Sequence, residues 1–300
     1  MNPAALEQVA RFRQYLAKER RLSVHTDSNY ARDLKALIRF CGQQGIADWA
    51  ALEHAQVRLF AARSHAGGLA PRSVQRRLSA VRSFLNFLIR DGILNRNCAL
   101  DVRAPKGQRR LPVTLDADTM ARLLEIPTDD ALAIRDRAIM ELLYSSGLRL
   151  AELVGLNLQD LNTADRTVRV LGKGSKTRVL PVGRKALSAL SAWLTQRRGL
   201  LRVDPQAVFV GAAGRRLGAR AIQKRVEYWA VRQGLPMHVH PHLFRHSFAS
   251  HLLESSGQLR AVQELLGHAD IATTQVYTHL DFQHLARIYD ATHPRARKKA

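Results

Sequence analysis

The sequence predicts a mainly helical fold with a small β-hairpin (α+β), divided between two domains. Apolar residues recur at helical spacing through most of the chain, whereas β-branched runs flank a Gly-Lys-Gly-Ser turn within residues 167–182. The chain has 300 residues, of which 46% are hydrophobic. This length is enough for about two ordinary domains, each with its own packed core.

Residues 1–100 form the first expected domain and are read as four helices. An apolar stripe at helical spacing marks the first, and the second follows Ser23, a residue type that caps helix N-termini. The third is expected over residues 51–65. The fourth begins at Pro71, which suits the first helical turn, and runs to Asp91.

A basic stripe lies opposite the apolar face of the fourth helix. It consists of Arg72, Arg76, Arg77 and Arg82. For a single helix, a solvated face explains such a stripe as well as DNA binding does. The whole chain favours DNA, because 47 Lys and Arg against 25 Asp and Glu give a net charge of +22. Such a charge opposes compaction unless a polyanion is near, and DNA or RNA releases counterions when its phosphates are neutralised.

Membrane and disulfide-dependent proteins do not fit the sequence. No apolar run approaches the roughly 20 residues that a membrane-spanning helix needs, and the N-terminus lacks the apolar stretch of a signal peptide. Cys41 and Cys98 are the only cysteines, too few for a disulfide framework or a four-cysteine zinc site. We therefore expect reduced thiols in a cytoplasmic protein without membrane association.

A linker is expected at residues 101–115, which combine two prolines, a glycine and four basic residues without periodicity. The second domain then covers residues 116–300 and contains the predicted hairpin. Its helical patterns lie at residues 117–126, 130–146, 184–198, 218–232 and, with short breaks, from about 242 onward.

Six residues of the second half can carry chemistry, although none is persuasive alone. They are Arg149, Lys173, His242, Arg245, His268 and Tyr277. Arg149 stands at the start of a helical pattern that follows a glycine, and a structural ion pair with Glu152, one turn later, accounts for it locally. Lys173 fits an exposed turn residue, and Tyr277 fits a half-buried aromatic.

Three familiar kinds of site fail on local sequence. The Gly-Lys-Gly-Ser-Lys-Thr turn is followed by a second strand, whereas a nucleotide-binding loop leads into a helix. His242 and His246 are spaced like helical zinc ligands, but Leu243 stands where a zinc protease has Glu. A metal-dependent nuclease needs clustered carboxylates, and the second half shows none. Adventitious metal binding stays open for His238, His240 and His251.

The remaining set consists of cations, imidazoles and one tyrosine, which suits attack on a phosphodiester. Phosphoryl transfer requires positioning and stabilisation of charge on the equatorial oxygens. Without a metal, guanidinium groups must supply that stabilisation. A tyrosine hydroxyl, with a reference pKa near 10, must lose its proton to become a good nucleophile. A lysine or an imidazole can then protonate the leaving hydroxyl.

The order Arg149, Lys173, His242-x-x-Arg245, His268, Tyr277 resembles the catalytic set of the tyrosine recombinase (phage integrase) family, in particular its Xer subfamily. The matching segments are GLRLAEL, LGKGSKTRVLPV, HPHLFRHSFASHLLESSG, VQELLGH and TTQVYTHL. The likeness extends over nearly the whole chain. It implies a C-shaped clamp, in which a helical core-binding (SAM-like) domain and a mainly helical catalytic domain close around duplex DNA.

The resemblance also implies a role for each matching residue. Tyr277 is the nucleophile and forms a 3′-phosphotyrosyl link. Arg149 and Arg245 clamp the scissile phosphate, and His268 helps to hold its oxygens. Lys173 protonates the 5′-hydroxyl that leaves.

His242, by the same resemblance, assists proton transfer with Tyr277. One departure lies next to it, because this chain has Leu243-Phe244 where the Xer pattern usually reads Lys-Leu. A buried apolar pair there keeps the helix packing but loses a possible phosphate contact.

The implied reaction needs neither ATP nor a metal cofactor, since the phosphotyrosine retains the ester energy. The implied partners are double-stranded DNA with paired, dif-like half-sites, a XerD-like recombinase in a heterotetrameric synaptic complex and, by analogy alone, a cell-division DNA translocase. The implied task is the resolution of chromosome dimers. The alternatives are a mobile-element integrase, a type IB topoisomerase-like enzyme and a non-catalytic basic DNA-binding protein.

Overall fold

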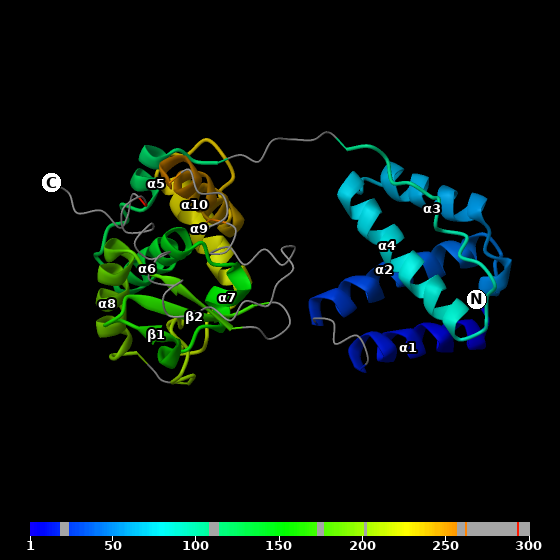
Figure 1. The fold of residues 1–300 in the computed structure, drawn as a ribbon, viewed down its shortest axis with the longest axis horizontal. Coiled ribbons are helices and arrows are strands. Elements are labelled where there is room, and N and C mark those ends of the chain that lie inside the picture. The colour runs from blue at the N-terminus through cyan, green and yellow to red at the C-terminus, as the bar shows by residue number, and fades with distance from the viewer. Residues whose placement is uncertain are drawn as a thin grey trace. The chain divides into compact units, whose positions relative to one another are not determined.

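A computed structural model describes residues 1–18, 24–107, 114–172, 177–200 and 203–256, together with Val262 and His293. The chain separates into two compact units, Met1–Arg110 and Leu111–Ala300 (Figure 1). The division falls within the segment 101–115 for which the sequence predicts a linker. Each unit has its own hydrophobic core.

The N-terminal unit is helical in its described residues. Its helices are α1 (Pro3–Lys18), α2 (Val24–Gln43), α3 (His54–Ala66) and α4 (Pro71–Arg90). Helix α4 contacts the other three. The centre of this core is aromatic, because Phe84 of α4 meets Phe12 of α1 and Trp49 edge-on, at centroid distances of 5.4 and 4.9 Å.

The expected start of the third helix at residue 51 is wrong by three residues. The Asp48 side chain accepts a hydrogen bond from the Ala50 backbone and starts a separate 3-10 turn, Trp49–Ala51. Helix α3 begins only at His54, where the Gln56 side chain accepts the backbone N–H of Glu53 at 2.6 Å. The predicted start of the fourth helix at Pro71 is confirmed.

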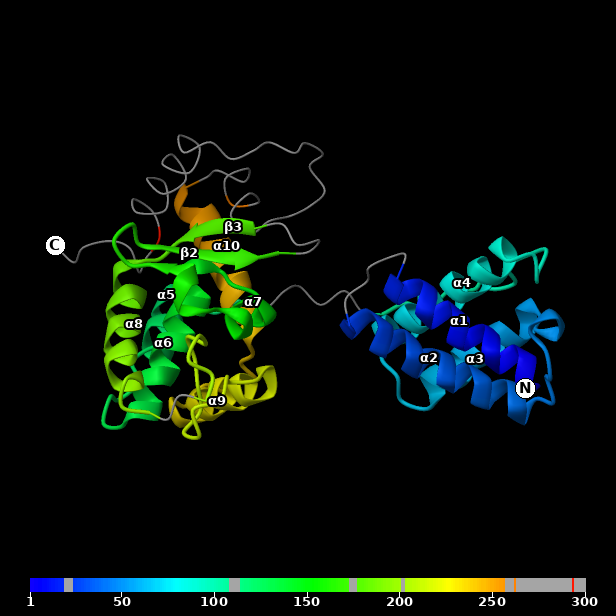
Figure 2. The ribbon, with the colours of Figure 1, turned by 90° about the horizontal axis from the view of Figure 1, so that it is seen from below.

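The C-terminal unit packs helices against a small sheet. Its helices are α5 (Ala117–Leu123), α6 (Ala131–Ser146), α7 (Leu150–Gly155), α8 (Arg184–Arg197), α9 (Ala219–Arg232) and α10 (Pro241–Ser256). The strands are β1 (Leu161–Asn162), β2 (Thr167–Leu171) and β3 (Thr177–Pro181). Helix α6 lies between α8 and α10 (Figure 2), and its residues are buried almost from end to end.

The described strands form one antiparallel sheet in the order β1-β2-β3. Strands β2 and β3 are the predicted hairpin, and Val168 and Leu180 face each other across it on the buried side. Strand β1 adds a short third strand that the sequence did not indicate. The predicted class, mainly helical with a small sheet, is confirmed.

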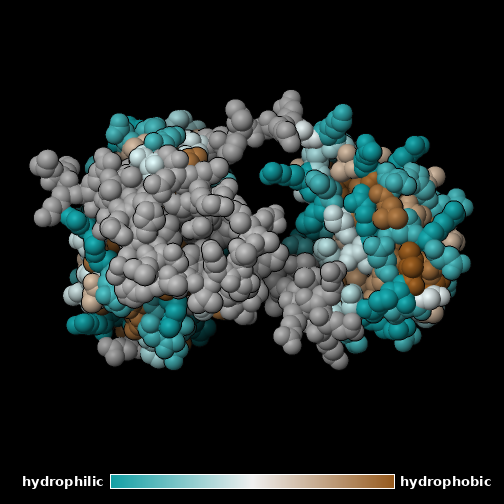
Figure 3. Space-filling view, viewed as in Figure 1, coloured by the Kyte–Doolittle hydropathy of each residue, from teal (hydrophilic) through white to brown (hydrophobic). Residues whose placement is uncertain are grey.

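The surface of the N-terminal unit is largely polar. On the face seen in Figure 3, hydrophilic residues surround small hydrophobic patches. Within the described ranges, no helix is both long and apolar enough to cross a membrane.

Cys41 is buried, and this burial raises the pKa of its thiol to about 11, which keeps it protonated and unreactive.

Candidate active site

Arg149 lies at the start of α7, directly after a sharp turn. Helix α6 ends at Ser146 and is capped by Gly147, whose backbone is left-handed with φ of 58°. Arg149 follows two residues later as the N-cap of α7. The Glu152 carboxylate accepts the Arg149 backbone N–H at 2.8 Å and its guanidinium at 3.0 Å. The ion pair suggested by the sequence is therefore present, and it holds Arg149 at the helix terminus.

Glu152 also binds Arg178 of β3. The two guanidinium nitrogens of Arg178 donate to the two carboxylate oxygens of Glu152 at 2.9 and 3.0 Å, a bidentate pair. Burial tends to raise the pKa of Glu152, but the hydrogen bonds from Arg178 and Arg149 outweigh it, and the net pKa is lowered. Glu152 is therefore ionised at neutral pH and joins the β2-β3 hairpin to α7.

Arg178 was not among the site residues predicted from the sequence. The alternation of the strand placed it without naming its partner, because Arg178 lies two positions before Leu180 and therefore on the same side of β3. A charged residue on that side of a strand needs a buried partner of opposite charge. The partner, Glu152, lies 26 positions earlier.

Arg245 reaches the same turn from α10. Its guanidinium donates to the Gly147 carbonyl at 2.6 Å. Burial lowers the pKa of Arg245 to about 10, and the positive charge of Arg149 is the next cause. Two guanidinium groups close enough to repel each other in a partly buried place form a site suited to an anion.

His242 lies one helical turn before Arg245 on α10. Burial lowers the pKa of His242, and the nearby charges of His246, Arg245 and Arg149 lower it further. The imidazole is therefore neutral at physiological pH, and it can accept a proton and pass it on.

The structure thus brings together three of the six predicted catalytic residues: Arg149, His242 and Arg245. The other three, Lys173, His268 and Tyr277, lie outside the described residues. Strands β2 and β3 pair up to Leu171 and Thr177, on either side of the predicted Lys173 turn. Leu243 and Phe244 are both buried, as expected for an apolar pair at that point.

The histidines do not gather into a metal centre in the described part of the chain. There, no group of three or more His, Cys, Asp or Glu side chains is arranged to hold a metal ion. His251 is buried and forms a 2.8 Å hydrogen bond with the Tyr144 hydroxyl. The rings of His238 and His240 lie 6.0 Å apart between centroids.

The arginines of α4 divide into internal and accessible ones. Arg76 and Arg77 both bind the buried Asp33 of α2, and Arg77 also donates to the Ser64 hydroxyl at 2.8 Å. Arg82 donates to the Ala99 carbonyl at 2.9 Å. Arg72 is exposed. DNA contact by these four arginines stays a prediction. The exposed Arg72 is accessible to a phosphate, whereas the guanidinium groups of Arg77 and Arg82 already donate to groups of the protein itself.

Gly147 is the residue of this turn that tolerates no side chain. An added Cβ would lie 2.5 Å from the buried Phe248 ring, and the φ of 58° disfavours any other residue. We expect Gly147→Ala to lower the free energy of unfolding by about 2–4 kcal/mol, from backbone strain and overpacking together. Urea unfolding of the full chain measures this change in the free energy of unfolding. Gly155→Ala is the control because its Cβ would meet nothing within 4 Å, and equal stability of the two variants would contradict this packing.

The chain is similar to known proteins over most of its length. The phage integrase family matches residues 113–284, and the phage integrase N-terminal SAM-like domain matches residues 9–92. Tyrosine recombinase XerC of Pseudomonas fluorescens is 56% identical over 286 residues, which cover 95% of each chain. Tyrosine recombinase XerC of Xanthomonas campestris pv. campestris (strain B100) is 54% identical over 296 residues, covering 99% of this chain and 91% of the relative.

A solved structure shows the same fold. It is the XerH site-specific recombinase bound to a palindromic difH substrate after cleavage, with a TM-score of 0.71 at 22% identity, covering 96% of this chain and 86% of that one. The sequence matches, the fold and the arginine pair point the same way. The chain therefore belongs to the phage integrase family, as a XerC-like site-specific tyrosine recombinase that transfers DNA strands.

Proposed function

We propose that this enzyme resolves chromosome dimers in the cytoplasm, by recombining a dif-like site with paired half-sites together with a XerD-like recombinase. The observation that carries the chemistry is the placement of Arg149, Arg245 and a neutral His242 around the Gly147 turn. The target is supported by XerC relatives that are more than half identical to this chain. The difH complex of XerH supports a site of the dif type.

Cleavage in this proposal is a transesterification at one phosphate. His242 assists removal of the Tyr277 hydroxyl proton, and the phenolic oxygen forms a bond to phosphorus while the bond to the 5′-oxygen breaks. Arg149 and Arg245 hold the nonbridging oxygens and, with His268, stabilise their charge. Lys173 gives a proton to the departing 5′-oxygen. A 5′-hydroxyl from the partner strand then reverses these steps, so the bond energy is conserved without ATP.

Residues outside the catalytic set would contact DNA, and further proteins would act with the enzyme. Arg72, together with Arg76, whose side chain stays 35% exposed beside Asp33, would contact phosphates from the N-terminal unit. A cell-division DNA translocase would activate the synaptic complex. The mobile-element, topoisomerase-like and non-catalytic alternatives are not favoured, because the XerC relatives match over nearly the full length.

Cleavage of a nicked dif-like duplex tests this function. We expect a denaturation-resistant protein–DNA adduct that persists in EDTA when monovalent salt is matched, because the arginines supply the charge stabilisation that metals give other nucleases. Salt must be matched because phosphate contacts make DNA binding steeply dependent on it. Electrophoresis under denaturing conditions measures the adduct, and a duplex with scrambled half-sites is the control.

Two results would contradict the proposal. Loss of the adduct in EDTA with recovery in magnesium or zinc would indicate a metallonuclease. Equal adduct on the scrambled duplex would reject the dif-like target.

A further inference from the structure

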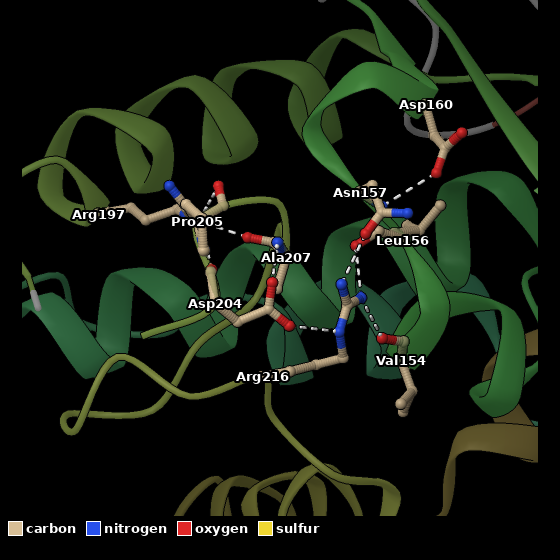
Figure 4. A network of polar contacts seen from close by, with 9 residues as sticks. All are labelled: Val154, Leu156, Asn157, Asp160, Arg197, Asp204, Pro205, Ala207 and Arg216. Carbon is tan, nitrogen blue, oxygen red and sulfur yellow. Dashed lines mark hydrogen bonds and ion pairs between the residues drawn. The ribbon is translucent and has the colours of Figure 1, made fainter. Parts of the chain in front are cut away.

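Helix α7, which carries Arg149 at its N-terminus, is held at the opposite end by Arg216. One terminal nitrogen of Arg216 donates to the carbonyls of Val154 and Leu156, both at 3.0 Å. The other donates to the Asn157 side chain at 2.6 Å. Figure 4 shows the guanidinium directed at these acceptors. Cationic side chains stabilise helix C-termini in this way, because they satisfy the last free carbonyls and complement their negative charge.

The Arg216 side chain is itself fixed by a second set of contacts. Its Nε donates to the Asp204 carboxylate at 3.0 Å, which orients the guanidinium plane (Figure 4). The other oxygen of Asp204 accepts the Ala207 backbone N–H at 3.1 Å, so Asp204 belongs to a tight turn. Arg197 of α8 closes this turn from the other side through the carbonyls of Pro205 and Ala207, both at 2.9 Å.

The same turn is joined to the chain that leaves α7. The Leu158 backbone N–H donates to the Gln206 carbonyl at 2.8 Å, and the Val208 N–H donates to the Leu156 carbonyl at 3.0 Å. Asn157 and Ala207 form a β-bridge. Backbone hydrogen bonds therefore join the segment that follows α7 to the turn that contains Asp204. Arg216 adds a side-chain connection from this turn to the carbonyls at the end of the helix.

The length of α7 makes its two ends mechanically dependent. Its six residues span only about 9 Å. The N-terminal end is held by Glu152, which binds both Arg149 and Arg178. Loss of the anchor at the other end allows the helix to tilt, and the tilt moves the Arg149 guanidinium. A misplacement of about 1 Å in a catalytic group can cost roughly 10²-fold in rate.

We propose that Arg216 is a positioning residue for Arg149, which sets the place of the phosphate-clamping guanidinium by fixing the C-terminal end of α7. This inference rests on the proposed role of Arg149 in cleavage. It predicts that Arg216→Ala slows formation of the covalent adduct by about 10–100-fold, whereas DNA affinity stays close to that of the wild type. Arg215→Ala is the matched control, because Arg215 is the exposed neighbour of the same charge.

A charge-neutral substrate separates positioning from simple loss of folded protein. In a methylphosphonate duplex, a methyl group replaces one nonbridging oxygen of the scissile phosphate and removes the charge that Arg149 has to stabilise. For each variant, the cleavage rate is divided by the wild-type rate on the same DNA. We expect the ratio to be low on phosphate and close to one on methylphosphonate for both Arg149→Ala and Arg216→Ala. A smaller folded fraction would instead lower both ratios equally.

The double variant adds an independent readout. If Arg216 acts through Arg149, the Arg149→Ala/Arg216→Ala protein is no slower on phosphate than Arg149→Ala alone, because the second change has nothing left to displace. Arg216→Lys keeps the charge but not the four hydrogen bonds, and it should resemble Arg216→Ala.

The outcomes distinguish this inference from the proposed function. A wild-type rate for Arg216→Ala, an absence of methylphosphonate rescue in that variant alone, or full additivity in the double variant would overturn the positioning role. If Arg149→Ala itself shows no rescue, the phosphate-clamping role of Arg149 is overturned first.

Discussion

Tyr277→Phe is expected to abolish both the covalent protein–DNA adduct and strand exchange, while binding to a recombination site survives. The change removes one hydroxyl oxygen, which is the atom that must bond to phosphorus, and leaves the ring in place. Binding depends on phosphate contacts by cationic side chains, and these are unchanged. Gel electrophoresis of the nicked duplex under denaturing and native conditions measures adduct and binding on the same samples.

Tyr289→Phe is the matched control for this change, because Tyr289 follows the proposed nucleophile by twelve positions and matches no part of the recombinase motif. It should retain full adduct formation. Adduct at the wild-type level in Tyr277→Phe would remove Tyr277 from the reaction.

Lys173→Ala is expected to slow cleavage by about 10²–10⁴-fold, the usual contribution of a general acid. Loss of DNA affinity should be small, because a single lysine adds at most one phosphate contact. A duplex with sulfur in place of the bridging 5′-oxygen should restore most of the rate, since a thiolate leaves without a proton. Quenched-flow measurement of adduct formation on both duplexes gives the two rates.

Two further variants make the sulfur experiment specific. Arg149→Ala should not be rescued by sulfur, because its defect is the stabilisation of charge on the nonbridging oxygens. Lys176→Ala should cleave both duplexes normally. Rescue of Lys176→Ala in place of Lys173→Ala would transfer the general-acid role to Lys176.

The sequence predicted helices such as α4 well because an apolar face recurs along their whole length. In α4, Pro71 marks the start and the apolar side chains recur at helical spacing to Leu88. For α7 the sequence indicated only the start of a helical pattern after Gly147. Its six residues are too few for a periodicity of 3.6 residues to be recognised. Strand β1 has two residues and carries no pattern of its own.

The candidate site was predicted from the order of its residues and not from their local settings. Arg149 has an ordinary explanation in its Glu152 ion pair, and the structure shows that this pair is part of the site. Arg178 and Arg216 were missed because their partners lie 26 and about 60 positions away in the chain. Such contacts depend on the tertiary fold, which local periodicity does not encode.

The same limit affects the basic stripe of α4. Its sequence pattern treats all four arginines alike, whereas in the structure Asp33 binds two of them and a backbone carbonyl at Ala99 binds Arg82. A buried carboxylate 43 positions from Arg76 could not be assigned to it in advance. Charge counts therefore predict the kind of partner, while the structure indicates which cations are accessible to it.

The attachment site of the DNA tests the central claim most directly. Mass spectrometry of the peptide bonded to a nicked dif-like duplex should find the phosphate on Tyr277. Tyr144 is 1% exposed and its hydroxyl bonds to His251, so it is not placed to attack DNA. A phosphate found on Tyr144, Tyr228 or Tyr289, or on a serine, would contradict the account.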